Sequence, residues 1–183
     1  MAKLQTPRWA WVLTGSGHFF TESFEFIREL EHCDVFVSKA ADEVLRMYKL
    51  KLDFPDTMRV LRDKTASAVP VGEFYHGVYH TVVVAPASSN TVAKCVWGIS
   101  DTLATNVFAQ AGKCRIPSIV FACDTAPELL TRAPHGMVKV FPRRIDLENT
   151  DRLKSFEYTT VVESLEDLKV AIRRRQAELK QDD

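Results

Sequence analysis

Short apolar runs that alternate with helical segments constrain the fold of this chain more than any other feature. Three of these runs read WAWVLT (9–14), TVVVA (81–85) and SIVFA (118–122). They lack the polar alternation of a half-exposed strand and are typical of parallel strands that helices cover on both faces. The pattern predicts an α/β fold, a three-layer, doubly wound parallel sheet of flavodoxin-like or Rossmann-like type, joined by right-handed crossovers.

The remaining segments complete this alternation. Further strands are expected over residues 33–38 and 159–162, with an edge strand over 137–141. Helices are expected over 22–32, over 42–50 with Asp42 as its cap, over 91–112 with a break near Gly98, and over 165–179. The stretch 51–76 has two prolines and mixed charges, and a short helix is the one element considered there.

Length and charge set the broad class of protein. With 183 residues the chain is about the size of one domain, so we expect a single domain over 1–183, with a core over 9–180 and a frayed tail at 181–183. Lys and Arg together number 24, as do Asp and Glu, so the formal net charge is zero. Nucleic acids and anionic membrane surfaces require a basic excess, and neither is predicted as a partner.

Targeting and cysteine usage point to the cytoplasm. No apolar run approaches the roughly 18 residues that a membrane helix needs, and the polar segment 1–8 lacks the apolar region of a signal peptide. The cysteines, none in a C-x-x-C or zinc-type spacing, are Cys33, Cys95, Cys114 and Cys123. We therefore expect reduced thiols, no disulfide framework and no metal site.

Small polar residues follow three of the predicted strands. They read TGSGH (14–18), Ser38-Lys39 and PASSNT (86–91). Ligands of open α/β sheets bind at the carboxyl ends of the strands, where hydroxyls and helix-terminal N–H groups can donate to phosphate oxygens. Three such loops at one edge predict a phosphorylated ligand.

A mononucleotide fits these loops better than a dinucleotide. The fingerprint G-x-G-x-x-G lacks its third glycine, because Phe20 stands there, and Ser38-Lys39 replaces the acidic residue that binds ribose. A ligand with one terminal phosphate is therefore predicted. A plain strand-to-helix turn remains the alternative explanation of the segment 14–17.

The third loop resembles a known family. The segments PASSNTVAK (86–94) and GISDTLAT (98–105) resemble the P-A-S-A-N-T and G-I-S-D-N-L motifs of the superfamily of homo-oligomeric flavin-containing cysteine decarboxylases. The resemblance extends from Trp9 to about Leu179. Within the superfamily, TGSGH, SDTLAT and RRIDLEN (143–149) are most similar to archaeal-type dihydromethanopterin reductases and archaeoflavoproteins.

The resemblance implies that FMN binds at the strand ends. Carried over by position, the cofactor-binding residues are Gly15, Ser16, Gly17, His18, Ser38, Pro86, Ser88, Ser89, Asn90, Thr91 and Cys123. It also implies a trimer or a larger homo-oligomeric assembly, with the flavin ring near a subunit boundary.

The chain departs from the decarboxylases of the superfamily in two respects. The segment 121–127 lacks the P-x-M-N-x-x-M-W substrate motif, and neither His76 nor His80 has the spacing of the histidine that these enzymes use. Thiol decarboxylation is therefore a minor hypothesis. His80, before a buried strand, and Trp97, in a helix, are expected to be packing residues.

The leading functional hypothesis is an FMN-dependent oxidoreductase that reduces a dihydropterin one-carbon carrier, of the dihydromethanopterin type. NAD(P)H is the expected electron donor, and one site serving two substrates in turn predicts ping-pong hydride transfer. His18, Asp124 and solvent are the candidate proton donors. Arg143 and Arg144 are candidates to bind a phosphate of NADPH or pterin carboxylates. The alternative is an FMN electron-transfer protein with a ferredoxin-like partner.

Overall fold

The chain folds around a parallel sheet. The structure, a computed structural model, describes residues 6–63 and 71–181. Within these residues the sheet has the strand order β3-β2-β1-β4-β5-β8, and every neighbouring pair is parallel. The strands are β1 (Arg8–Leu13), β2 (Cys33–Val37), β3 (Val60–Arg62), β4 (Tyr79–Ala87), β5 (Ser118–Ala122) and β8 (Thr159–Val162). The predicted α/β architecture is confirmed, and the strand order is that of Rossmann-type sheets.

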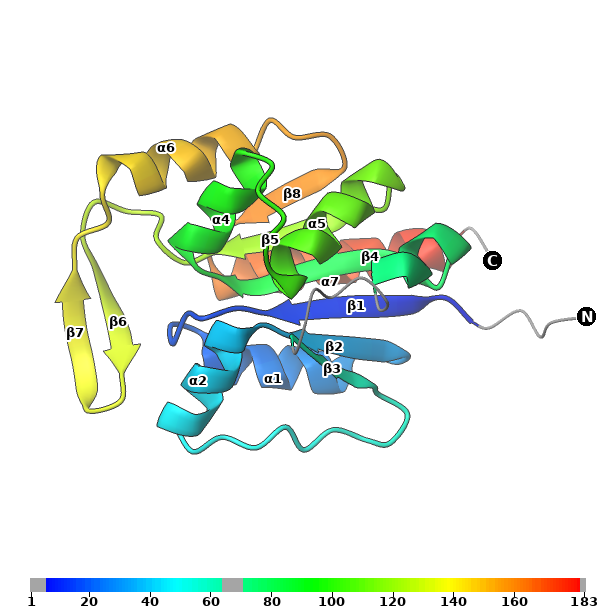
Figure 1. Cartoon of the computed structure of the whole chain (residues 1–183), viewed down its shortest axis with the longest axis horizontal. Coiled ribbons are helices and arrows are strands. Elements are labelled where there is room, and N and C mark those ends of the chain that lie inside the picture. Colours follow the sequence, from blue (N-terminus) through cyan, green and yellow to red (C-terminus); the bar gives the residue numbers. More distant parts are fainter. Residues whose placement is uncertain (1–5, 64–70, 182–183) are drawn as a thin grey trace, which may run out of the picture.

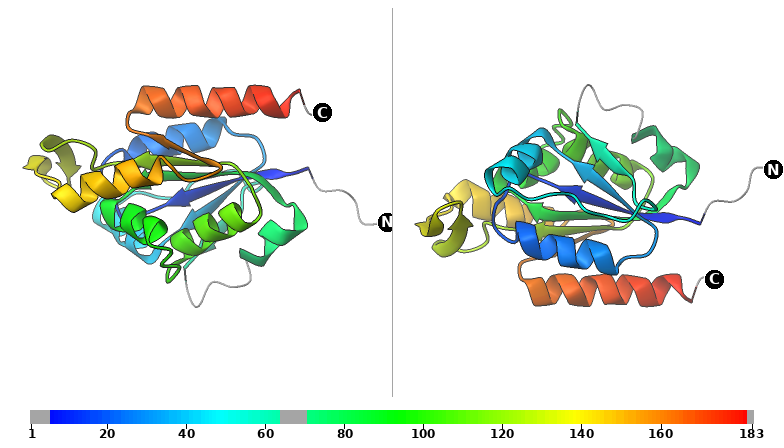
Figure 2. Two further views of the ribbon diagram at one scale, coloured as in Figure 1. Left: turned by 90° about the horizontal axis from the view of Figure 1, so that it is seen from above. Right: turned by 90° about the horizontal axis from the view of Figure 1, so that it is seen from below.

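Helices cover both faces of this sheet (Figure 2). They are α1 (Phe20–Glu29), α2 (Lys39–Met47), α4 (Ser89–Val96), α5 (Leu103–Lys113), α6 (Arg144–Leu153) and α7 (Leu165–Leu179), with a short 3₁₀ helix η1 (Glu73–His76). Along β1, Trp9, Trp11 and Leu13 pack against α1, α2 and α7. Ala10 and Val12 join the opposite core, with α4 and α5. Alternate side chains of one strand thus enter different cores, which explains why the run is apolar throughout.

Capping residues fix where the helices begin. Helix α2 was expected to start at Asp42, but Ser38 is its N-cap and accepts a hydrogen bond from the Ala41 amide at 3.1 Å. Ser38 directly follows β2, so its hydroxyl reaches the third amide of the helix, which is the geometry that capping requires. Asp42 lies within the first turn and instead forms an ion pair with Arg62 of β3.

The break predicted near Gly98 is confirmed. Helix α4 ends at Val96, Gly98 has a φ of +69°, and α5 begins after Thr102. Glycine adopts this left-handed conformation without steric cost. The Thr102 and Thr105 side chains then form a capping box at the start of α5. The expected start at residue 91 was late, because Ser88 caps α4.

One predicted strand lies outside the parallel sheet. The edge strand expected over 137–141 is β7 (Gly136–Val140), which pairs antiparallel with β6 (Leu129–Ala133) in a separate hairpin. A two-residue turn can join antiparallel strands but not neighbouring parallel ones. Because residues 134 and 135 alone link these two strands, β7 pairs with β6 and cannot lie in the parallel sheet.

Two further predictions concern the stretch 51–76 and the frayed tail at 181–183. The short helix considered within 51–76 is the 3₁₀ helix η1, and β3 was not anticipated; residues 64–70 lie outside the described part. Of the predicted frayed tail, residues 182–183 also lie outside it. The Gln181 amide still donates to the Glu178 carbonyl at 3.0 Å. None of the helices over 6–63 and 71–181 combines the length and apolar composition that crossing a membrane requires.

Candidate functional site

The predicted site residues follow the carboxyl ends of β1, β2, β4 and β5. Figure 1 shows these strand ends pointing toward one side of the molecule, where the β6–β7 hairpin stands beyond them. β1 leads into α1 on one face of the sheet, whereas its neighbour β4 leads into α4 on the other face. This is a topological switch point, the place where open α/β sheets leave a crevice for ligands.

Two helix N-termini face this switch point. The Ser38 hydroxyl caps α2, and the Ser88 hydroxyl accepts a hydrogen bond from the Thr91 amide of α4 at 3.4 Å. The first two amides of each helix have no acceptor within their own helix. Each serine oxygen accepts a hydrogen bond in its cap, and the Ser38 hydroxyl hydrogen can still be donated. The Ser88 and Thr91 hydroxyls lie 3.1 Å apart and share one hydrogen bond, so one of their two hydrogens is left to donate. The arrangement therefore offers hydroxyl and amide donors of the kind that bind a phosphate.

At both glycines of the first loop, a side chain would collide with neighbouring residues of the protein. A Cβ atom on Gly15 would lie 2.5 Å from the Ala40 Cβ in the first turn of α2. A Cβ on Gly17 would lie 2.4 Å from the Tyr48 hydroxyl oxygen. The glycines were predicted to let the backbone approach an anion. The structure gives them a further reason, because they let the loop pack closely against the first turn of α2 and against Tyr48.

His18, Cys123 and Asp124 form a group at the loops after β1 and β5. Burial lowers the pKa of His18, and the charges of Asp124 and Glu22 act against that shift. A lowered pKa keeps the imidazole neutral at pH 7. The Cys123 thiol lies 3.9 Å from the His18 carbonyl oxygen, and burial raises its pKa to about 12. Cys123 is therefore a protonated, buried thiol at neutral pH, with no thiolate chemistry.

The two arginines predicted to bind substrate differ in their surroundings. Arg143 precedes α6, and its Nε and Nη2 atoms donate to the two carboxylate oxygens of Asp146 at 3.0 and 2.8 Å. The Arg144 side chain is 90 % exposed and pairs with Glu148 at 3.1 Å. The guanidinium of Arg143 is thus held in place, whereas Arg144 is free to reorient. Substrate binding by these residues stays a prediction.

The hairpin beside the site is an element that sequence reasoning did not associate with it. The Tyr48 hydroxyl donates to the Arg132 carbonyl at 2.9 Å and connects β6 to the end of α2. Large exposed apolar side chains gather on the hairpin and the segment after it, namely Leu130, Met137, Val138, Phe141 and Ile145. The apolar residues of 129–133 and 136–140 around a two-residue turn were the sequence signal for this hairpin.

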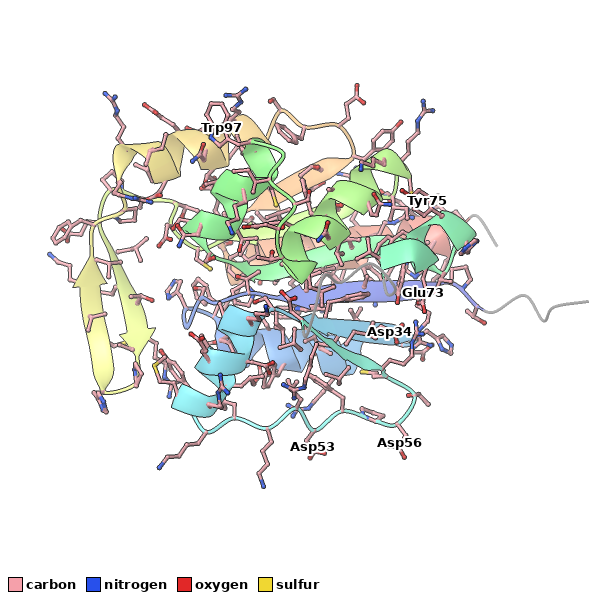
Figure 3. The ribbon with its side chains drawn as sticks, in the orientation of Figure 1. Asp34, Asp53, Asp56, Glu73, Tyr75 and Trp97 are labelled. Atoms are coloured by element: carbon pink, nitrogen blue, oxygen red, sulfur yellow. The ribbon has the colours of Figure 1, made fainter. Side chains whose placement is uncertain are left out.

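The residues expected to pack do so away from the site. Trp97, labelled in Figure 3, donates its indole N–H to Asn149 at 3.3 Å, and the Arg152 guanidinium lies 4.6 Å from the ring centroid. His80 lies at the opposite end of the sheet, where its ring packs edge-on against Trp9 at 5.1 Å. The ring contact of His80 agrees with a structural role, whereas Trp97 is 59 % exposed and packs only in part.

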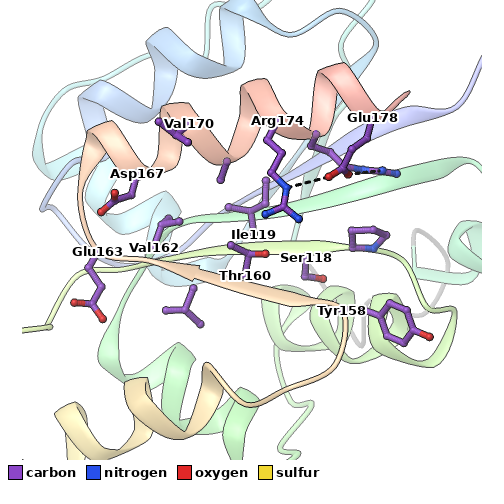
Figure 4. A pocket seen from close by; sticks show the side chains of 14 residues that line it. Ser118, Ile119, Tyr158, Thr160, Val162, Glu163, Asp167, Val170, Arg174 and Glu178 are labelled. Atoms are coloured by element: carbon purple, nitrogen blue, oxygen red, sulfur yellow. Dashed lines mark hydrogen bonds and ion pairs between the residues drawn. The ribbon is translucent and has the colours of Figure 1, made fainter. Parts of the chain in front are cut away.

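A groove of about 520 Å³ lies between β8 and α7 (Figure 4). Its floor includes Ile119 and Thr160, and Val170 and Arg174 of α7 form one wall. None of the predicted site residues lines this groove. It is a feature of the sheet's lateral edge and separate from the switch point.

Comparisons with known proteins find relatives in sequence and in structure. A family model described as "Flavoprotein" matches residues 2–181. The crystal structure of Burkholderia xenovorans DmrB in complex with FMN, described as a cubic protein cage for redox transfer, is 54 % identical with a TM-score of 0.87. That match covers 95 % of this chain and 97 % of the other. A phenylacrylic acid decarboxylase from Aquifex aeolicus, 21 % identical with a TM-score of 0.66, covers 86 % and 81 % and shares the fold.

Two archaeal relatives are similar in sequence. An uncharacterised protein of Methanocaldococcus jannaschii is 34 % identical over 172 residues, which are 89 % of this chain and 92 % of that protein. A dihydromethanopterin reductase (acceptor) of Methanosarcina mazei is 35 % identical over 144 residues, 71 % of this chain. This match spans only 60 % of the length of the reductase.

Proposed function

The chain belongs to the Flavoprotein family, and from this premise we propose that it is an FMN-dependent reductase acting on a dihydropterin of the dihydromethanopterin type. The observation that carries the proposal is the pair of serine-capped helix N-termini at the β1–β4 switch point. The names of the Burkholderia xenovorans FMN complex and the Methanosarcina mazei reductase support the cofactor and the substrate class.

The donor set at this edge suits the phosphate of FMN. Ser38 and Ser88 present hydroxyls at the starts of α2 and α4, and the loop Gly15–Gly17 lies between them. Ser89, Asn90 and Thr91 occupy the first turn of α4, where helix amides and the helix dipole favour an anion. Pro86, at the end of β4, and Cys123, after β5, flank this group and contact the cofactor in the proposal.

Protonation of the pterin nitrogen is assigned to the neighbourhood of His18 and Asp124. When bound, FMN supplies the ring atom that accepts a hydride from one substrate and passes it to another. A neutral His18 held by burial can relay a proton at its ring nitrogens, and the Asp124 charge stabilises its protonated form. Arg143 and Arg144, on the same side of the molecule, would bind the anionic groups of the substrate or of NADPH.

If the electron donor and the pterin bind at the same site, the donor must leave before the pterin can bind. This arrangement predicts ping-pong kinetics with NAD(P)H as donor. In the alternative, the protein accepts single electrons from a ferredoxin-like partner. A flavin-dependent cysteine decarboxylase is the third and weakest candidate, because the solved decarboxylases share the fold at low identity.

We further propose that the protein forms a homo-oligomer built from trimers, with the flavin near a subunit boundary. In this proposal the carboxyl ends of the strands bind the phosphate, and a neighbouring subunit covers the flavin ring. The exposed apolar side chains of the hairpin, such as Met137 at 61 % and Phe141 at 66 %, lie on the side of these strand ends. Exposed apolar patches of this kind mark interaction surfaces, and the Burkholderia xenovorans relative is described as a cage.

The visible spectrum of the purified protein, followed by anaerobic addition of NADH and NADPH in separate cuvettes, tests the proposal. The reductase hypothesis expects a flavin spectrum that bleaches rapidly with one nicotinamide and recovers on addition of dihydromethanopterin. Bleaching only by a reduced iron–sulfur protein would favour the electron-transfer alternative. A colourless protein that cannot be reconstituted with FMN contradicts the proposal at its base.

A further inference from the structure

Thr14 is a polar side chain buried at the centre of the switch point. It follows β1 and is only 1 % exposed. Its hydroxyl donates to the Pro86 carbonyl oxygen at 2.7 Å and accepts a hydrogen bond from the Ser88 amide at 3.0 Å. One hydroxyl therefore joins the loop after β1 to both the last residues of β4 and the N-cap of α4.

The hydrogen bonds of Thr14 lie just beyond the end of the main-chain hydrogen bonding between β1 and β4. Main-chain pairing between β1 and β4 ends at Val12 and Val84. Beyond that pair, side chains of the β1 segment make the connection. The Trp11 indole donates to the Ala85 carbonyl at 2.7 Å, and Thr14 makes the two bonds further along. The position of the α4 N-terminus relative to the first loop thus depends on side-chain chemistry.

The two helix N-termini at the site are held in different ways. The N-cap of α2 is fixed by main-chain atoms, since the Ser38 amide donates to the Leu13 carbonyl at 3.2 Å. The N-cap of α4 is fixed by the Thr14 hydroxyl. Any residue at position 13 supplies a carbonyl, but only serine or threonine at position 14 supplies a group of this size that donates and accepts together.

We infer that Thr14 is a positioning residue, which holds the start of α4 against the loop Gly15–Gly17 and thereby sets the affinity for the phosphate of FMN. This inference rests on the proposed function. Thr14 acts through Ser88 and touches no ligand. Because it orders only the phosphate end of the site, its loss weakens the binding of FMN and leaves the binding of riboflavin, which lacks the phosphate, nearly unchanged.

The test compares the two flavins on the same apoprotein. Thr14→Val keeps the shape and removes both hydrogen bonds, while Thr14→Ser keeps the hydroxyl. Flavin fluorescence quenching gives each Kd. We expect Thr14→Val to weaken FMN binding by about tenfold or more, since two buried groups lose their partner, with riboflavin binding changed less than about twofold. Thr14→Ser retains the preference for FMN.

Two further variants separate positioning from a general loss of structure. Trp11→Phe removes the neighbouring bond to Ala85, and we expect it to affect both flavins equally. Thr14→Ala removes the same hydroxyl and gives the same comparison if the valine variant does not fold. Equal losses for FMN and riboflavin in the Thr14 variants, or unchanged FMN binding, overturn the inference alone. A wild-type protein that binds neither flavin contradicts the proposed function itself, and the inference with it.

Discussion

The amino ends and the carboxyl ends of the parallel strands, called here the amino edge and the carboxyl edge of the sheet, use polar residues in opposite ways. At the amino edge, Asp34 is fully buried and both of its carboxylate oxygens are occupied. Oδ1 accepts from Arg8 at 2.7 Å and from the Arg59 amide at 3.1 Å, and Oδ2 accepts from the Arg59 side chain at 2.6 Å and from Tyr79 at 3.0 Å. Glu73 binds the same guanidinium at 2.7 Å (Figure 3).

At the carboxyl ends of β2 and β4, the groups that cap the helices are small, uncharged hydroxyls. Ser38 and Ser88 each satisfy one amide of their own helix. Ser38 keeps a hydroxyl hydrogen to donate, and the Ser88–Thr91 hydroxyl pair keeps one between them. An ionic network around a buried carboxylate resists rearrangement, because removing one partner leaves a buried charge. A set of caps with spare donors can bind an anion. One edge therefore stabilises the fold and the other is available for a ligand.

The largest effect should come from Asp34→Ala, which tests the amino edge. It leaves the guanidinium groups of Arg8 and Arg59 without their buried partner, and we expect a loss of about 3–5 kcal/mol in the free energy of unfolding. Urea denaturation measures it. Asp101→Ala removes an exposed partner of Lys94 and should cost far less, because exposed ion pairs contribute little to stability. A weaker FMN affinity in the folded Asp34 variant would contradict the division between the edges.

Gly15→Ala tests the carboxyl edge by packing. The new Cβ would lie 2.5 Å from the Ala40 Cβ, so α2 must shift. Overpacking of this kind costs about 1–3 kcal/mol, and moving the Ser38 cap should weaken FMN binding as well. Thermal unfolding and FMN titration measure both. Gly112→Ala in α5 meets nothing within 4 Å and should be neutral or slightly stabilising; equal behaviour of the two variants would contradict the packing argument.

His80 makes the amino edge sensitive to pH. Burial, and then the charge of Arg175, lower its pKa to about 4 in the folded protein, from 6.5. Between these values the unfolded chain binds more protons, so stability falls as pH decreases from about 6.5 to about 4. His80→Gln should flatten that part of the profile of unfolding free energy against pH. An unchanged profile in the His80 variant would contradict this assignment.

Asn90→Asp introduces a negative charge at the proposed phosphate site without altering shape. We expect FMN binding to weaken by about tenfold through repulsion between like charges, with the thermal unfolding temperature unchanged. Added salt should reduce the difference. Asn106→Asp in the first turn of α5 carries the same charge change away from the site. Unaltered FMN affinity in the Asn90 variant would exclude Asn90 as a near contact.

The smallest effect belongs to Tyr48→Phe, which releases the hairpin from the end of α2. One hydrogen bond to the Arg132 carbonyl is lost, at a cost of about 1 kcal/mol. Hydrogen exchange should accelerate in β6 and β7 and remain unchanged in the parallel sheet. Tyr75→Phe, an exposed tyrosine of η1, is the control. Uniform acceleration across the whole chain would show that the hydroxyl does more than hold the hairpin.

Local patterns were sufficient for much of the molecule. The apolar runs predicted the parallel strands, and β5, β8 and α7 have the expected bounds. The small polar residues after β1, β2 and β4 were correctly associated with strand ends, because parallel strands all end at the same edge. The break near Gly98 was also predictable, since glycine and the following capping residues are local signals.

Tertiary structure decided the features that depend on distant partners. Asp34 lies 26 positions after Arg8 and 25 positions before Arg59. No sequence periodicity therefore marks these three residues as one network. β3 was missed because three residues carry too little pattern, and its strand character depends on pairing with β2.

The sequence by itself determined the layered architecture and the edge that carries the site, because burial periodicity and strand-end chemistry are written in neighbouring residues. Only the tertiary structure revealed that Thr14 links two loops 74 positions apart and that the hairpin stands outside the sheet. The physical reason is that a hydrogen bond or a strand pair acquires its partner only when the chain has folded.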